Sequence, residues 1–262
     1  MSSVSPFLGP KLKAQWGETR AGELARALGE FTATNPYKAV RGPSGGVAVE
    51  YVGQFPAEIP LILGDAVHNL RTALDLLACD LVALNKKSPK NVYFPFAETA
   101  DDIDEMINKR KFDRAGDAAV ELLKEMKPYR GGNAMLRALH DLDIMDKHQL
   151  IIPVQHTNRV TSIQSQVPGV EVTIGRGCHV SIGSGAEISV GGVAPKLDIQ
   201  TIVVFADNGP APLSGRPVLE TLKELAQLVR GIIKSFELLT SGWGDNVLPT
   251  GQTYRLLYGK PI

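Results

Sequence analysis

The sequence has little cysteine and no excess charge of either sign. Its 262 residues include two cysteines, Cys79 and Cys178, which form neither a Cys-x-x-Cys pair nor a recurring cysteine–histidine spacing. Two free thiols are typical of a reducing compartment and argue against a disulfide-held secreted fold. Lys plus Arg and Asp plus Glu number 28 each, so the net charge is zero and gives no indication of a nucleic-acid partner.

Long apolar runs and targeting signals are also missing. The most apolar helical stretch, residues 73–84, is interrupted by Asp75 and Asp80. No span of roughly 20 apolar residues exists, and the N-terminal residues lack the basic start and apolar core of a secretory signal. We therefore expect a cytoplasmic protein that makes no membrane contact.

The common nucleotide-binding and hydrolytic signatures are absent as well. The sequence contains no P-loop, no Gly-x-Ser-x-Gly elbow and no His-Glu-x-x-His zinc motif. A glycine-rich stretch at residues 41–46 lies between two predicted strands and lacks a following helix, which disfavours a phosphate cradle. No cofactor is predicted.

Hydrophobic periodicity predicts a mainly helical region over residues 1–150. Helices are predicted at residues 11–31, 60–85 and 133–150, and start and stop signals predict two more, one starting at residues 99–102 and one at residues 117–127. A small N-terminal hairpin is expected where the β-branched stretches 37–40 and 47–52 flank a Gly-Pro-Ser-Gly-Gly turn.

The sequence changes character after Pro153. Three eight-residue units begin at Val172, Val180 and Ile188, each a β-branched triplet followed by glycine. Their period is wrong for a hexapeptide β-helix, so we expect short antiparallel strands, a β-meander, over residues 151–210. Glycine tolerates positive φ, which predicts turns at or beside the glycines of these units, Gly175, Gly183 and Gly191.

The remaining residues, 211–262, are predicted as a C-terminal helix and a tail that packs on the helical region. The helix is expected over residues 218–239, and the tail from residue 243 carries Trp243, Tyr254 and Tyr258. The order of elements predicts an α+β fold in which a helical bundle holds an inserted antiparallel β-sheet.

Polar residues of functional types share one face of the helix predicted at residues 60–85. At about 100° per residue, this stripe comprises Asp65, His68, Arg71, Thr72 and Asp75. A solvated helix face favours Lys, Glu and Gln, so His, Arg and Asp here indicate contact with another element.

The helix predicted at residues 133–150 offers complementary groups. Asp146 lies on its apolar arc, and a buried carboxylate needs a cation or several hydrogen-bond donors. We predict that Asp146 is buried and pairs with Arg71, with Asp143 at the edge of the arc as the alternative. The candidate catalytic residues are His68, Arg71, His140, Asp146 and Lys147.

Three segments resemble a family of uncharacterised bacterial proteins: GDAVHNLRTALDLLACDLV, YFPFAET and KPYRGGNAMLRALHDLDIMDKHQLI. The resemblance covers about the first 150 residues. It implies a bacterial origin and implies that the GDxxHNLRxALD-type and LDxxDKH-type segments form one unit. It assigns no activity to either segment.

Two functional hypotheses follow. In the first, the polar cluster is structural and the protein is a non-catalytic binding or assembly module. In the second, the protein is a hydrolase acting on a phosphodiester. His68 or His140 would then be the acid–base group, and Arg71 or Lys147 would stabilise anionic charge. Partners stay unassigned, and homo-oligomerisation is open.

The hydrolase hypothesis has two forms. A metal-independent form resembles HEPN ribonucleases, although the arginine-to-histidine spacing of that family is not reproduced. A form with a metal resembles HD-type phosphohydrolases through the doublet His140-Asp141, with His68 upstream. The Gly-Lys that follows the doublet in that family is replaced by Asp143-Ile144, and we expect no metal.

Overall fold

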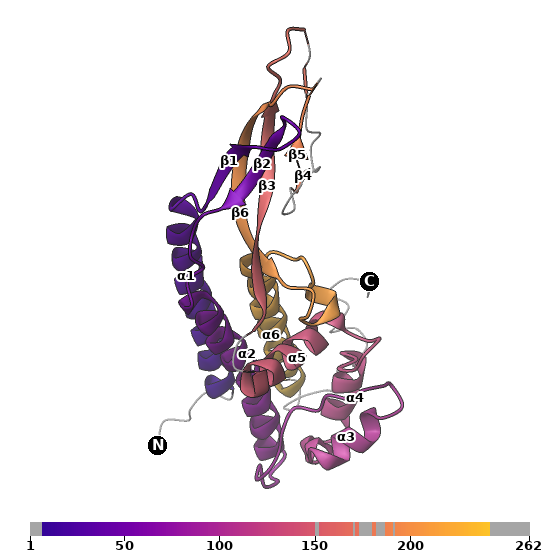
Figure 1. The fold of residues 1–262 in the computed structure, drawn as a ribbon. Helices are drawn as coiled ribbons and strands as arrows, with labels where there is room; N and C mark the ends of the chain where they lie inside the picture. The colour runs from indigo at the N-terminus through magenta and orange to yellow at the C-terminus, as the bar shows by residue number, and fades with distance from the viewer. Residues whose placement is uncertain are drawn as a thin grey trace.

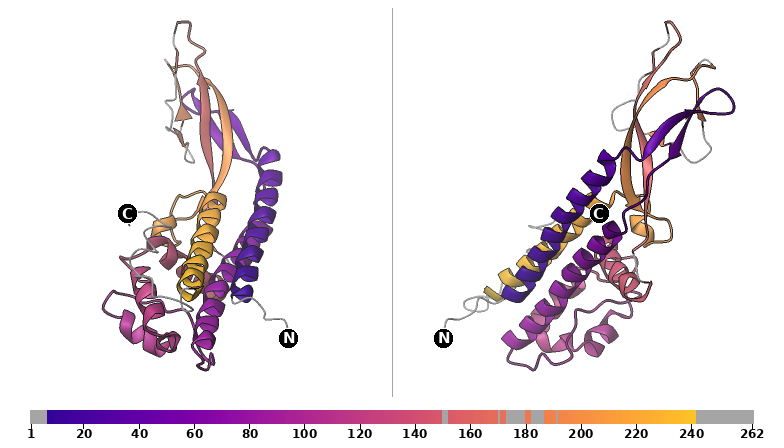
Figure 2. Two further views of the ribbon diagram at one scale, coloured as in Figure 1. Left: turned by 180° about the vertical axis from the view of Figure 1, so that it is seen from behind. Right: turned by 60° about the vertical axis from the view of Figure 1, so that its left-hand side comes forward.

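A helical body carries a narrower β arm at one end (Figures 1 and 2). The computed structural model describes residues 7–149, 152–169, 171–172, 180–181, 187–190 and 192–241. The predicted α+β class is confirmed. The helices are α1 (Leu8–Ala33), α2 (Glu58–Leu84), α3 (Ile103–Lys109), α4 (Asp117–Glu125), α5 (Ala134–Gln149) and α6 (Val218–Ser241), with short 3-10 turns at Phe112–Ala115 and Ala211–Leu213.

The helices α1 and α2 pack closely and run antiparallel, and α6 lies along both (Figures 1 and 2). Gly17 of α1 makes the close approach, because a methyl group there would lie 2.8 Å from Leu70 Cδ2 and 3.3 Å from the Ala66 carbonyl oxygen. The core side chains of α2 are fully enclosed, among them Leu63, Leu70, Leu74 and Leu77. Each such leucine stabilises the fold by about 1.5–3 kcal/mol relative to exposure.

The arm is built from chain segments that are far apart in the sequence. Its strands are β1 (Tyr37–Arg41), β2 (Val47–Tyr51), β3 (Val154–Gln164), β4 (Val180–Ser181), β5 (Glu187–Ile188) and β6 (Lys196–Phe205). In the described part of the chain they form two antiparallel sheets, ordered β1-β2-β5 and β4-β3-β6. The N-terminal hairpin therefore pairs with the later β region.

Some predicted features lie outside the described residues: the turn glycines Gly175, Gly183 and Gly191, and the tail from residue 243. The described strands β4 and β5 are short and antiparallel, as expected for the repeat units. Among the described helices, none has the length and apolar character needed to cross a bilayer.

One histidine joins the arm to the body. The His156 ring of β3 stacks on Tyr51 with centroids 4.0 Å apart, and its Nδ1 forms a hydrogen bond with the Tyr37 hydroxyl. The ring centroids of Phe55, which precedes α2, and of Phe31, in α1, lie 5.6 and 6.2 Å from the centroid of the His156 ring. Burial raises the pKa of Tyr37 to about 12 and lowers the pKa of His156, so both rings stay neutral at pH 7.

Gly17→Ala should lower the free energy of unfolding by roughly 1–3 kcal/mol, because an added methyl group overpacks a filled helix contact. Gly22 is a matched control in the same helix, since a methyl group there meets nothing within 4 Å. Gly22→Ala should raise that free energy by up to about 1 kcal/mol through helix propensity. Urea unfolding measures both, and equal effects would contradict the close contact.

Candidate functional site

The polar stripe of α2 faces two different neighbours. Its first half, around His68, meets α5, and its second half, around Asp75, meets the segment at residues 91–97. The predicted single cluster is therefore divided into two parts with different exposure to solvent.

Arg71 belongs to the part that is sealed. Its Nη1 forms an ion pair with Asp75 Oδ1 at 2.7 Å, and its Nη2 donates to the Phe94 carbonyl at 3.4 Å. The guanidinium also lies 4.6 Å above the Phe96 ring. The predicted pair between Arg71 and Asp146 is therefore wrong: Asp75, one turn along the same helix, supplies the carboxylate.

His140 is half-buried beside the same segment. Its ring is parallel to Phe96 with centroids 4.3 Å apart, and its Nδ1 accepts a hydrogen bond from Arg71 Nε at 3.4 Å. Burial, followed by the charges of Arg71 and Arg137, lowers the pKa of His140 to about 3. A histidine this hard to protonate is badly matched to acid–base work near neutral pH.

Asp143, and not Asp146, is the enclosed carboxylate of α5. Its Oδ1 lies 3.0 Å from His68 Nδ1, and its Oδ2 accepts a hydrogen bond from Lys147 Nζ at 2.6 Å. Asp146 is half-buried against Gly64, where a methyl group would overlap its carboxylate. Burial, followed by the charge of Asp143, raises the pKa of Asp146.

The part of the cluster that faces solvent consists of His68, Lys147 and the neighbouring Thr72. The side chains of His68 and Lys147 are 45% and 48% exposed, whereas Asp143 between them is enclosed. Thr72 Oγ1 lies 3.5 Å from His68 Nε2. The sequence of hydroxyl, imidazole and carboxylate matches the connectivity of a nucleophile activated by an oriented base.

A second set of ion pairs occupies the His-Asp doublet. Arg137 is buried and contacts Asp141 Oδ1 at 3.0 Å, Glu98 Oε1 at 2.6 Å and the Ala97 carbonyl at 2.5 Å. Arg130 binds the same two carboxylates. Asp141 therefore meets cationic side chains, and no group of three or more His, Cys, Asp or Glu in the described residues has a metal-binding arrangement.

Sequence reasoning missed Arg130, Arg137 and Glu98 as partners. The spacing of Arg137 and Asp141, one helical turn apart, was a local signal for one of these ion pairs. The contacts to Glu98 could not be predicted from local spacing, because Glu98 comes 32 positions before Arg130 and 39 before Arg137.

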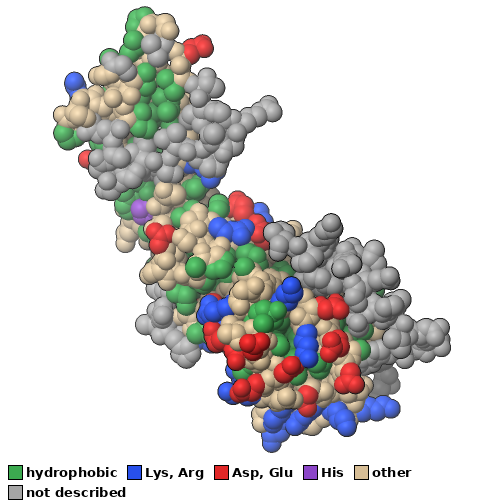
Figure 3. Space-filling model, turned by 90° about the vertical axis from the view of Figure 1, so that its right-hand side faces the viewer, with side chains coloured by type: hydrophobic (Ala, Val, Ile, Leu, Met, Phe, Trp, Pro, Cys, Tyr) green, Lys and Arg blue, Asp and Glu red, His purple; other side chains and the backbone are tan. Residues whose placement is uncertain are grey.

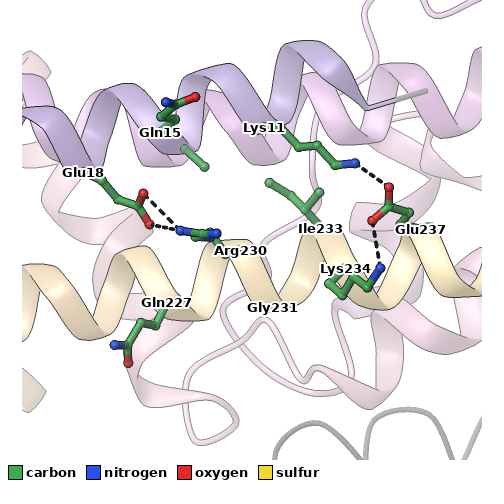
Figure 4. Close-up of a pocket in the computed structure, with 10 residues that line it drawn as sticks. Lys11, Gln15, Glu18, Gln227, Arg230, Gly231, Ile233, Lys234 and Glu237 are labelled. Atoms are coloured by element: carbon green, nitrogen blue, oxygen red, sulfur yellow. Dashed lines mark hydrogen bonds and ion pairs between the residues drawn. The ribbon is translucent and has the colours of Figure 1, made fainter. Parts of the chain in front are cut away.

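Three cavities of about 780, 530 and 520 Å³ lie away from this cluster. The largest of the three is a groove between α1 and α6 (Figure 4). The second is lined by residues around Phe31, at the end of α1 where the arm begins, and the third lies on the arm near Arg41. The described linings of these cavities do not include His68, Arg71 or Asp143.

No protein family, curated protein or solved structure matches this chain.

Asp75→Ala should lower the free energy of unfolding by about 3–5 kcal/mol, because it leaves the Arg71 charge buried without its carboxylate. Asp146→Asn is the matched control. The raised pKa of Asp146 means that the fold disfavours its charge, so the amide should be neutral or stabilising. Urea unfolding at pH 7 measures both, and the reverse order would restore Asp146 as the partner of Arg71.

Stability should fall with acid through His140. Its folded-state pKa, about 3, lies below the ordinary 6.5, so the unfolded chain takes up the proton first as pH falls. The stabilisation is complete above pH 6.5 and is lost between 6.5 and about 3, by up to about 1.4 kcal/mol per pH unit. Urea unfolding between pH 7 and 5 should show a shallower slope for His140→Gln than for wild type.

Proposed function

We propose that the protein is a non-catalytic binding or assembly module and that the polar cluster between α2 and α5 is structural. One observation carries this proposal. The charged residues at the centre of the cluster, Arg71, Arg137 and Asp143, are each at most 7% exposed and are each paired within the fold. Groups committed to internal partners are poorly placed to stabilise charge that develops on a substrate.

Electrostatics also explains why such a cluster suits a structural role. A buried charge costs several kcal/mol unless it is paired and hydrogen-bonded, so each pair tolerates few alternative packings. Arg71 joins α2 to the segment at residues 91–97, and Asp143 joins α5 to α2. We infer that the cluster fixes the relative position of these elements.

The shape of the molecule supports a binding role. The arm extends the surface well beyond the helical body (Figure 1), and hydrophobic side chains gather on its described part in the view of Figure 3. It contains a small hydrophobic cluster in which Val49 and Val160 are buried and partly buried side chains such as Ile163 and Ile199 pack against them. The body in the same view carries interspersed acidic and basic groups (Figure 3), which is typical of a solvated surface.

His68→Ala tests the proposal directly. Wild-type protein should not turn over RNA, DNA or nucleotide substrates, with or without divalent metal ions. The substitution should lower the free energy of unfolding by about 1–3 kcal/mol, because the buried Asp143 carboxylate loses its hydrogen bond with His68 Nδ1. Urea unfolding measures that loss. Wild-type turnover that disappears in His68→Ala at unchanged stability would contradict the proposal.

A phosphodiester hydrolase is the second candidate, favoured by the solvent-facing Thr72 and His68, with His68 held by the buried Asp143. In this case His68 is the acid–base group and Lys147 stabilises anionic charge. Arg71 and His140 contribute packing, since Arg71 is buried and the half-buried His140 has its pKa lowered to about 3. Lys147→Ala then separates the candidates: it should abolish turnover in a hydrolase, and it has no turnover to remove in a binding module.

A further inference from the structure

Three large apolar side chains are exposed on the outer face of α1. Leu8, Leu12 and Trp16 follow one another at intervals of four residues and are between 42% and 55% exposed. Residues at this spacing lie on one face of a helix, so they form a continuous stripe. Contiguous exposed apolar surface of this kind marks a site that another segment or molecule covers.

A groove adjoins the stripe. The groove between α1 and α6 has a volume of about 780 Å³, and Lys11 and Gln15 of α1 line its wall (Figure 4). These residues alternate with the stripe along α1, so the groove and the stripe meet across one helix. The apolar side chains of Ala14 and Ile233 also line the groove.

Ion pairs across the groove show at which level of α1 the helix α6 ends. Lys11 pairs with Glu237, and Glu18 pairs with Arg230 at 2.9 Å. Early residues of α1 therefore meet late residues of α6, and the two helices are antiparallel. Ser241, the last residue of α6, follows Glu237 by one turn. The chain consequently leaves α6 at about the level of Leu8.

The residues that follow α6 are rich in large apolar side chains. Residues 242–262 contain Trp243, Val247, Leu248, Tyr254, Leu256, Leu257 and Tyr258. The stripe from Leu8 to Trp16 is about 12 Å long at the helical rise of 1.5 Å per residue. An extended chain covers this distance with about four residues, at roughly 3.3 Å each.

We propose that residues 242–262 of the same chain cover the stripe formed by Leu8, Leu12 and Trp16 and the adjoining groove. This segment follows the end of α6 at about the level of Leu8, carries apolar side chains and is covalently attached. A short connection gives a tethered segment an effective concentration in the millimolar range, which a free partner rarely reaches. This assignment is independent of the binding function proposed above.

The two tryptophans of the chain make the proposal measurable, because Trp16 lies in the stripe and Trp243 in the following segment. In the full chain with Trp243→Phe, Trp16 is the sole tryptophan. Its acrylamide quenching constant should be about twofold lower than in a protein ending at Ser241, because packing shields the indole from the quencher. Its emission should also lie at shorter wavelength in the full chain.

Two further variants keep the test decisive. If the shortened protein folds poorly, Leu248→Asp, Leu256→Asp and Leu257→Asp in the full Trp243→Phe chain should expose Trp16 to the same extent. As a control, Tyr93→Trp combined with Trp16→Phe and Trp243→Phe places the sole tryptophan beside Arg110, where shortening should change nothing.

Two results would overturn the proposal. Equal quenching of Trp16 in the full and shortened proteins would show that residues 242–262 do not cover the stripe. Protection that survives shortening and rises with protein concentration, with a dimer in sedimentation, would assign the stripe to a second copy of the chain.

Discussion

The packing of the body depends on how Arg71 is accommodated inside it. The guanidinium is held by Asp75, by the Phe94 carbonyl and by the face of Phe96. Asp75 also accepts a hydrogen bond from the Phe94 backbone N–H at 2.9 Å. One carboxylate therefore positions both the Arg71 guanidinium and the segment at residues 91–97 that covers it. Phe96 then provides the surface on which His140 stacks, and that contact positions α5.

The position of α5 in turn decides which of its carboxylates is buried. With His140 beside Phe96, the next turn brings Asp143 to His68, and the turn after that brings Asp146 to Gly64. The buried Arg71 and Asp143 are paired, and His140 is neutral at pH 7, whereas His68 and Lys147 face solvent. This separation is why a constellation of catalytic residue types is compatible with a structural role.

The sequence predicted what depends on local periodicity. The helices expected at residues 60–85 and 218–239 correspond to Glu58–Leu84 and Val218–Ser241, because apolar spacing is a property of each segment alone. The helix itself was predicted for α5, but its arc placed Asp146 inside and Asp143 at the edge, whereas Asp143 is buried, and the predicted partner of Asp146 was wrong. Which residue of the arc meets Arg71 depends on the axial offset between two helices, and periodicity does not contain that offset. Pairing of the N-terminal hairpin with β5 was hidden for the same reason.

The arm enters and leaves the body in two separate excursions of the chain. One runs from α1 through β1 and β2 to α2, and the other runs from α5 through the later strands to α6. Each excursion begins and ends at helix termini, so a change of length inside either one leaves the register of the helices intact. The arm is thus built from two separate insertions, and their loops are places where new sequence could be grafted. The ring contacts of His156 would still hold the arm against the helical body.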